Sequence, residues 1–303
     1  MKVGETMRVT QNMLNQNMLT SLNRNLGKME TLQRQMTTGK KINKPSDDPV
    51  GLSSAMRYRS ELEANEQYQR NLDDAQSWVE FNDTTVGQAV DVLHRARELA
   101  VQGANDSNPQ EAKNAVASEV EELFDQLMDI ANSQFNGKYV FNGQKTDQPP
   151  YPTDDAYQDT TFDDGKINFE VSRSLVLNVN VHAGQVFGEA EDEDNAFATL
   201  NALSTALRDG DKDGVDQALG HLDSRLDQVL ESWSDIGARS NRLELIDNRL
   251  KDSDTNMQTL LSKTEDADMA AVITNLRTAE NVYQASLATG ARIISPTLMD
   301  FLR

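Results

Sequence analysis

The sequence lacks cysteine entirely across its 303 residues. Disulfide bonds, thiolate metal sites and cysteine nucleophiles are therefore excluded. Aromatic residues are sparse at 6%, and hydrophobic residues reach only 37% against 26% charged residues. That balance is lean for a compact enzyme and typical of elongated helical packing, although the length allows about one to three domains with a core.

Long apolar runs and an excess of positive charge are missing as well. The first thirty residues hold no apolar block of seven or more, and no run elsewhere is long enough to cross a bilayer. We therefore expect neither a cleaved signal peptide nor membrane insertion. The formal net charge of −20 argues against a nucleic-acid partner, because phosphate binding needs clustered Lys and Arg.

The charge is unevenly distributed along the chain. Residues 1–45 carry 8 Lys/Arg against 2 Asp/Glu, whereas residues 139–235 carry 6 Lys/Arg against 20 Asp/Glu. We therefore expect the middle of the chain to be strongly solvated. Its acidic stretch EAEDEDN, residues 189–195, is interpreted as the approach to a helix capped by Asp194 or Asn195.

Motifs that carry chemistry are absent too. The histidines His94, His182 and His221 have no second His or Cys at metal-ligand spacing. The chain has no GxSxG nucleophile elbow and no glycine-rich phosphate loop. We therefore predict no catalytic, cofactor-binding or metal site, and we interpret the chain as a non-enzyme.

One acidic segment imitates the first half of a calcium loop. The run DGDKDG, residues 209–214, has acidic residues at its first, third and fifth positions and glycine at its sixth. The twelfth position, which should supply a bidentate glutamate, is Gly220. An acidic turn between helices is the favoured interpretation, and calcium binding is kept as the alternative.

Apolar residues recur three or four positions apart in the first half of the chain. They predict an amphipathic helix near Val9–Thr38 and, after a corner, an unusually long helix that ends at about Gln102. The segment GANDSNP, residues 103–109, supplies stop and restart signals. The helix that follows is expected to end near Asn136–Gly137.

The second half begins with a change of period and then returns to helix. The stretches KYVF, KINFEV and SLVLNVNV are rich in β-branched and aromatic residues and predict strands, with Asp163-Asp164-Gly165 as a turn. Helix is expected from near Asp194 to the DGDKDG run, and then with coiled-coil-like spacing to about Leu261. A last helix is predicted from Asp266 to about Ile294.

The corner between the first two helices, TTGKKINKPSDDPVGL at residues 37–52, is heavily specified. Asp48 fits an N-cap and Pro49 the first helical position, with the carboxylates of Asp47 and Asp48 facing the positive end of the helix dipole. Gly39 suits the left-handed position that ends the preceding helix. The predicted structural corner consists of Gly39, Asn43, Pro45, Asp47, Asp48 and Pro49.

This corner resembles the segment after the first helix in the flagellin superfamily. Its Pro-Ser-Asp-Asp-Pro run is similar to the hook-associated protein 3 branch, whereas flagellins are usually alanine-rich there and lack the flanking prolines. FNGKYVFNGQKTDQPPY at residues 135–151 also resembles that branch, as do TEDADMAAVITNL, YQASLATGARI and SPTLMDFL near the C-terminus. The resemblance covers nearly the whole chain.

Two departures accompany the resemblance. The branch usually begins with a sequence like MRVTQNM, which starts here at Met7, so Met1–Thr6 is either an extension or an upstream start. Pro296 replaces a helix-compatible residue, so we do not expect the terminal helix to continue unbroken to Arg303.

The residue patterns predict a mainly α fold with a small β insertion (α+β), in which the N- and C-terminal helices form an elongated bundle and the middle domain contains β-strands. We expect the following segments: 1–45, the N-terminal assembly helix and corner; 46–138, a long helical hairpin of the rod; 139–193, a β-rich middle insertion; 194–265, the helical return of the rod; and 266–303, the C-terminal assembly helix.

The resemblance implies a structural component of the bacterial flagellum that joins the hook-associated ring to the flagellin filament. It implies export through the flagellar type III apparatus to the extracellular flagellum and assembly as a homo-oligomeric ring. The implied partners are the proximal hook-associated protein 1, flagellin and an export chaperone that binds the C-terminal helix. Flagellin itself and a soluble helical adaptor or binding module are the alternatives.

The terminal stripes are the candidate subunit interface, because they have no partner except each other and neighbouring copies. Burial of either stripe alone does not offset the entropy of ordering its helix, so we expect both ends to become helical only when packed. The candidate interface residues are Leu14, Met18, Leu22, Leu26, Met29, Met36, Met269, Ile273, Leu276, Tyr283 and Leu287.

Overall fold

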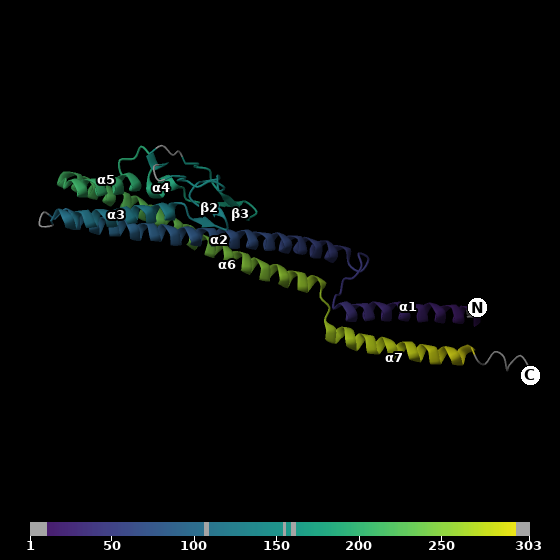
Figure 1. The fold of residues 1–303 in the computed structure, drawn as a ribbon. Coiled ribbons are helices and arrows are strands. Elements are labelled where there is room, and N and C mark those ends of the chain that lie inside the picture. The colour runs from purple at the N-terminus through teal and green to yellow at the C-terminus, as the bar shows by residue number, and fades with distance from the viewer. Residues whose placement is uncertain (1–10, 106–108, 154–155, 159–161, 295–303) are drawn as a thin grey trace, which may run out of the picture. The chain divides into compact units, whose positions relative to one another are not determined.

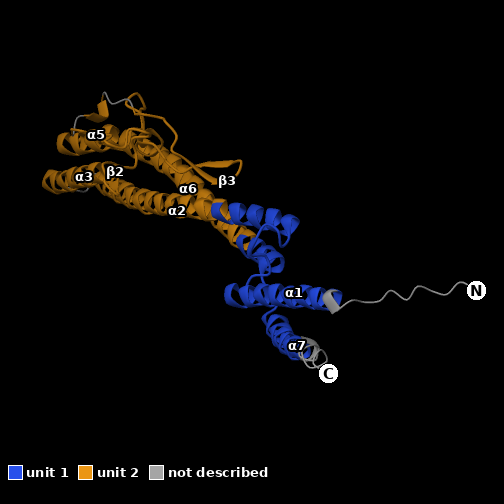
Figure 2. Cartoon of the chain, turned by 90° about the vertical axis from the view of Figure 1, so that its right-hand side faces the viewer, with its two compact units in different colours: residues 1–63, 254–303 blue, residues 64–253 orange. Residues whose placement is uncertain are grey.

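The computed structural model describes residues 11–105, 109–153, 156–158 and 162–294 (Figure 1). The predictions about Met7 and Pro296 lie outside these residues. The chain divides into two compact units, unit 1 with residues 1–63 and 254–303 and unit 2 with residues 64–253 (Figure 2).

Helices account for most of the described residues, which confirms the mainly α fold with a small β insertion. The helices are α1 (Gln11–Thr38), α2 (Pro49–Gly103), α3 (Gln110–Ala131), α4 (Ala183–Phe187), α5 (Ala196–Asp209), α6 (Lys212–Glu265) and α7 (Met269–Ile294), with a 3-10 helix, η1, at Ala156–Gln158. The periodicity predicted the long helices to within a few residues. The short α4 and η1 were not predicted, because neither spans enough turns to show a period.

The third helix ends earlier than the sequence pattern predicted. Strand β1 (Gln134–Phe135) follows α3 and pairs antiparallel with β2 (Lys138–Tyr139). Asn136 and Gly137, which were predicted to end the helix, both adopt positive φ angles, of 51° and 75°. A two-residue Asn-Gly turn with two positive φ angles favours a tight β-hairpin, so the prediction of a helix up to this point was wrong.

The second hairpin also turns at a different place from the one predicted. Strands β3 (Asn168–Ser172) and β4 (Leu175–Asn178) pair antiparallel, with Arg173 and Ser174 between them. The predicted turn at Asp163–Gly165 instead precedes β3, and Asp163 Oδ2 accepts a hydrogen bond from the Gln144 backbone N–H at 2.6 Å. Asp163 thus holds a loop in place and does not reverse a strand.

Unit 2 is built around one large hydrophobic core. Side chains from α2, α3, α5 and α6 meet there with residues of the β region. Tyr151, Phe187 and Phe197 form a buried aromatic group, in which the Tyr151 and Phe197 ring centroids lie 4.7 Å apart. The buried Asn82 side chain of α2 donates to the Val179 carbonyl at 3.1 Å, and this bond ties the β region to the helices.

Capping residues define both ends of α5 and the start of α7. Asn195, one of the two predicted caps, accepts hydrogen bonds from the backbone N–H groups of Phe197 and Ala198. Gly210 ends α5 with a left-handed φ of 70°. Asp268 accepts from the N–H groups of Ala270 and Ala271, so α7 begins three residues later than the predicted Asp266.

Candidate assembly surface on the terminal helices

The two terminal helices, α1 and α7, lie side by side within unit 1 (Figure 1). Their small core consists of Leu32 from α1 with Leu276 and Ala279 from α7, and Met29 packs against it. The Asn25 side chain also donates to the Ser286 hydroxyl at 3.4 Å. The sequence prediction that the two ends pair is therefore confirmed.

This pairing covers only part of the apolar surface of the two helices. Among the candidate interface residues Leu276 is buried, Met18, Leu22, Met29 and Tyr283 are partly buried, and Leu14, Leu26, Met36, Met269, Ile273 and Leu287 are exposed. The structure adds Met13, Leu19 and Val282 to the exposed set, with Leu19 at 60% exposure. Sequence reasoning missed these three because it followed a single stripe on each helix.

Four of these residues help to line an apolar groove of about 340 Å³ between the two helices. Met18, Leu19 and Leu22 line one side, and Leu287 and Gly290 line the other. Gly290 allows this close approach, since a Cβ placed on it would lie 1.9 Å from the terminal methyl of Met18. In a single chain, the groove and the neighbouring side chains expose an apolar surface to water, which is unfavourable in free energy.

The corner that precedes α2 has the predicted cap. Asp48 Oδ1 accepts from the Gly51 N–H at 2.9 Å, Pro49 is the first residue of α2, and Gly39 has a left-handed φ of 71°. Asp47 behaves differently from the prediction. Its Oδ2 accepts from the N–H groups of Asn43 and Lys44, at 3.0 and 2.8 Å.

Asp47 therefore closes the loop on itself and does not face the α2 dipole. These backbone hydrogen bonds lower the pKa of its carboxyl. The Asn43 side chain adds a bond to the Lys40 carbonyl at 2.7 Å. Gly51 is a corner residue that sequence reasoning missed, because a Cβ there would lie 2.4 Å from Asp48 Oδ2 and 2.7 Å from the buried Ile42 side chain.

The corner is joined to the segment between α6 and α7. The Lys41 N–H donates to the Glu265 carbonyl at 2.6 Å, and the Ala267 N–H donates to the Gly39 carbonyl at 2.9 Å. The buried Glu265 carboxylate pairs with both Lys40 and Arg59. We call this set of contacts the unit 1 joint.

Opposing effects set the pKa of the Glu265 carboxyl in this joint. Burial is the largest single effect and raises the pKa, but the hydrogen bonds and positive charges of Lys40 and Arg59 together outweigh it and hold the pKa below its ordinary value of 4.5. Glu265 is therefore ionised at neutral pH, where it can serve both cations. No sequence pattern had indicated Glu265, because its partners, Lys40 in the corner and Arg59 on α2, lie more than two hundred residues away along the chain.

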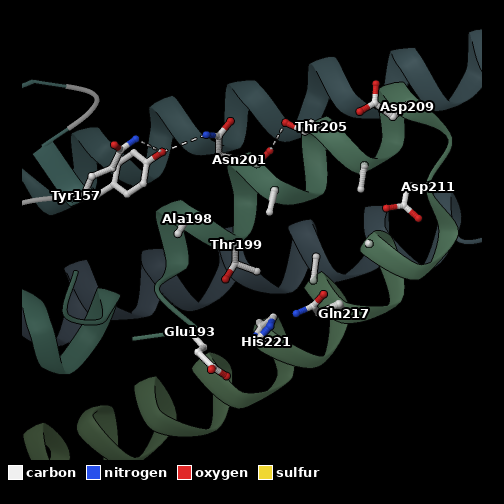
Figure 3. Close-up of a pocket in the computed structure, with 15 residues that line it drawn as sticks. Tyr157, Glu193, Ala198, Thr199, Asn201, Thr205, Asp209, Asp211, Gln217 and His221 are labelled. Atoms are coloured by element: carbon white, nitrogen blue, oxygen red, sulfur yellow. Dashed lines mark hydrogen bonds between the residues drawn. The ribbon is translucent and has the colours of Figure 1, made fainter. Parts of the chain in front are cut away.

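Unit 2 also contains an open groove, of about 670 Å³, between α5 and α6 (Figure 3). Asp209, at the end of α5, and Asp211, in the turn before α6, line one end, and Glu193 and His221 line the other. The DGDKDG run therefore connects two helices by a short acidic turn, as the favoured interpretation proposed, and α6 begins within the run at Lys212. Across the described residues, no three His, Asp or Glu side chains gather closely enough to hold a metal ion.

None of the helices in the described part of the chain is both long enough and apolar enough to span a membrane.

Two family models match the two ends of the chain. The bacterial flagellin N-terminal helical region matches residues 9–146, and the bacterial flagellin C-terminal helical region matches residues 219–302. Together they cover well over half of the sequence, including both terminal helices.

Curated relatives come from two kinds of flagellar protein. Hook-associated protein 3 of Escherichia coli is 27% identical over 275 residues, which cover 83% of this chain and 86% of that protein. Flagellin of Bacillus subtilis is 26% identical over 296 residues, which cover 93% of this chain and 94% of that protein. Overall identity therefore does not separate the two kinds.

Solved structures share the fold. A putative flagellar hook-associated protein from Vibrio parahaemolyticus superposes with a TM-score of 0.67 at 21% identity, covering 73% of this chain and all of that one. The flagellar junction protein FlgL from Legionella pneumophila superposes with a TM-score of 0.60 at 19% identity, covering 70% of this chain and all of that one. With both family models matched and the fold shared, the chain belongs to the flagellin superfamily and is a structural component of the bacterial flagellum.

Proposed function

We propose that the protein forms the junction between the hook-associated ring and the flagellin filament. The observation that carries this proposal is the α1–α7 pair, which leaves apolar side chains from Leu14 to Leu287 exposed in a chain of net charge −20. Such a surface is typical of a subunit interface and not of an isolated helix pair. The candidate interface residues are proposed to pack against neighbouring copies and against adjoining flagellar proteins.

The corner favours a junction role over a filament role. Pro45 and Pro49 fix two φ angles, Asp47 closes the loop, and Asp48 caps α2. The Pro-Ser-Asp-Asp-Pro run resembles the hook-associated protein 3 branch, and the relatives include hook-associated protein 3 of Escherichia coli. We propose that this corner, held by the unit 1 joint, gives the terminal helices a fixed exit direction in the assembly.

The remaining parts of the proposal follow from the flagellar family. The protein is exported through the flagellar type III apparatus, acts outside the cell, forms a ring of identical copies between hook-associated protein 1 and flagellin, and is served by a chaperone that binds its C-terminal helix. It acts mechanically and not as an enzyme. The segments 1–45 and 266–303 are proposed as assembly segments, 46–138 and 194–265 as the rod, and 139–193 as its β-rich insertion.

Substitutions on the exposed apolar surface test this function. In cells that lack the endogenous protein, the unaltered chain should restore filaments. Leu19→Gln and Val282→Gln should leave thermal unfolding unchanged but reduce filament number, because both side chains are exposed in the single chain. Flagellin should then collect in the medium. The matched control is Asn23→Gln, an exposed polar residue on α1. Filaments of normal number in cells without the protein would contradict the junction role.

Flagellin is the second candidate, favoured by the match to Bacillus subtilis flagellin over 93% of this chain. A filament subunit would be present in far larger numbers per flagellum than hook-associated proteins are. Quantitative mass spectrometry of isolated flagella separates the two functions, because the junction role predicts that the protein is a minor component at every filament length.

A further inference from the structure

A small basic pocket lies in unit 2, away from the terminal helices. Its volume is about 230 Å³, and its lining includes the side chains of Lys166, Arg239 and Arg242 but no Asp or Glu. The lining also includes the apolar residues Val79, Leu177 and Leu243. Val79 and Leu243 are buried members of the unit 2 core, so the pocket has a rigid apolar base.

None of these three cations has an ion-pair partner among the described residues. Arg239 is half-buried and donates from Nη1 to the Asn180 carbonyl at 3.0 Å, which fixes one side of its guanidinium. Four of the other arginines of unit 2 form ion pairs: Arg95 with Glu119, Arg97 with Asp223, Arg208 with Glu121 and Arg225 with Asp194. The pocket therefore concentrates unpaired positive charge.

This concentration is unusual for the composition of the chain. With 49 Asp/Glu against 29 Lys/Arg, acidic partners are in excess, yet none lines this pocket. Like charges around an apolar base repel one another and favour an incoming anion. A planar guanidinium with free N–H groups matches a carboxylate in particular, since the two can form paired hydrogen bonds.

We propose that this pocket receives carboxylates from a second copy of the chain, donated by the loop between α4 and α5. In that loop Glu191 and Glu193 are exposed and make no ion pair within the described residues. Within the described residues of one chain, Glu191 and Glu193 therefore form no ion pair with the pocket cations, and both sets of charges stay available for a contact between copies. Glu193 is labelled in Figure 3, at one end of the open groove between α5 and α6.

The pairing of a pocket with a different surface has a consequence for symmetry. Each copy gives its acidic loop to one neighbour and receives a loop from another, which is a heterologous contact. Contacts of this type build rings or helical arrays, whereas a self-complementary contact stops at a dimer. The inference rests on the proposed function insofar as that function requires many copies side by side.

Cross-linking tests the contact directly, because the chain has no cysteine of its own. The full-length variant with Arg242→Cys and Glu191→Cys is treated with a short bis-maleimide linker, both in isolated flagella and as concentrated purified protein. A ladder of dimers, trimers and larger species is expected. Mixing the two single-cysteine variants should give dimers only, and each single variant alone should give none.

Charge reversal supplies an independent measurement. Arg242→Glu should reduce the protein retained in isolated flagella by about tenfold or more, because like charges then face each other across the contact. Glu191→Lys in the same chain should restore much of the retention. Lys138→Glu is the matched control, since it places a glutamate at an exposed cation of β2, and it should have no effect.

The outcomes separate the inference from the proposed function. Absence of cross-links in both samples, or dimers alone from the double variant, would overturn the inter-copy contact. Inorganic phosphate that shifts the Arg239 side-chain NMR signals at millimolar concentration, without cross-links, would make the pocket a small-anion site instead. Labelled protein at the hook–filament boundary without cross-links would contradict this inference while leaving the junction role intact.

Discussion

Lys40 and Glu265 form an ion pair across the unit 1 joint, and Arg59 pairs with the same carboxylate. The carboxylate is buried, while both cations are nearly half exposed. Glu265→Gln should therefore weaken the joint by only about 1 to 2 kcal/mol, less than a fully buried pair would lose. Hydrogen exchange of the Lys41 and Ala267 amides measures this loss, since both donate across the joint.

The same pair gives the joint a pH dependence. The native pKa of Glu265 lies below its ordinary value of 4.5, so its stabilisation is fully present above about pH 5 and is lost as the pH falls through the native pKa. Glu265→Gln should remove this acid-induced loss. Glu280→Gln should retain it, because Glu280 is an exposed residue of α7 that forms no ion pair within the described residues. Equal acid sensitivity in the unaltered chain and in Glu265→Gln would contradict this role.

The N-cap of α2 should matter more in the assembly than in the free chain. Asp48→Ala removes the hydrogen bond to the Gly51 N–H and should cost about 1 kcal/mol. Asp48→Asn keeps an acceptor oxygen and is the control. We expect a small shift in thermal unfolding with Asp48→Ala but a clear reduction in filament number. Normal thermal unfolding together with a normal filament number would contradict this role and show that the corner only connects the two helices.

Buried and exposed arginines of unit 2 should differ sharply in their effect on stability. The Arg225 side chain is fully buried and pairs with Asp194, so Arg225→Ala should cost about 3 to 5 kcal/mol because it leaves a buried carboxylate unpaired. Arg97 pairs with Asp223 with both side chains about half exposed, and Arg97→Ala should cost about 0 to 1 kcal/mol. Urea unfolding of the two variants checks the contrast, and similar midpoints would contradict it.

The terminal helices should be only weakly protected in the free monomer. Their shared core holds Leu32, Leu276 and Ala279, which is little burial to offset the entropy of ordering two helices. Hydrogen exchange at low protein concentration should show fast exchange over residues 14–36 and 276–287. Strong protection there would show that the α1–α7 pair is stable by itself.

Sequence periodicity was sufficient for the long helices because each repeats its apolar pattern over many turns. It failed at Asn136–Gly137, where the same two residues suit either a helix end or a hairpin turn. The strand pairing of Gln134 with Tyr139 decides between them, and that is a non-local interaction. Local signals therefore predict an element reliably only where it is long.

Only part of the candidate assembly surface could be predicted, because local spacing identifies apolar stripes but not the contacts that form after folding. Stripe residues such as Leu276 could be found from their spacing, but which of them stay exposed depends on how α1 meets α7. Glu265 and Gly51 could not be found from a local pattern, because their roles come from close contacts with Lys40, Arg59 and Ile42 after folding. The sequence likewise does not show that Arg242 lacks an ion-pair partner within the described residues, because that depends on which side chains meet after folding.

Electron microscopy of intact flagella carrying a labelled version of the protein tests the central claim most directly. The junction role predicts label at the hook–filament boundary and none along the filament. Label distributed along the whole filament would contradict the junction role and make the protein a filament subunit.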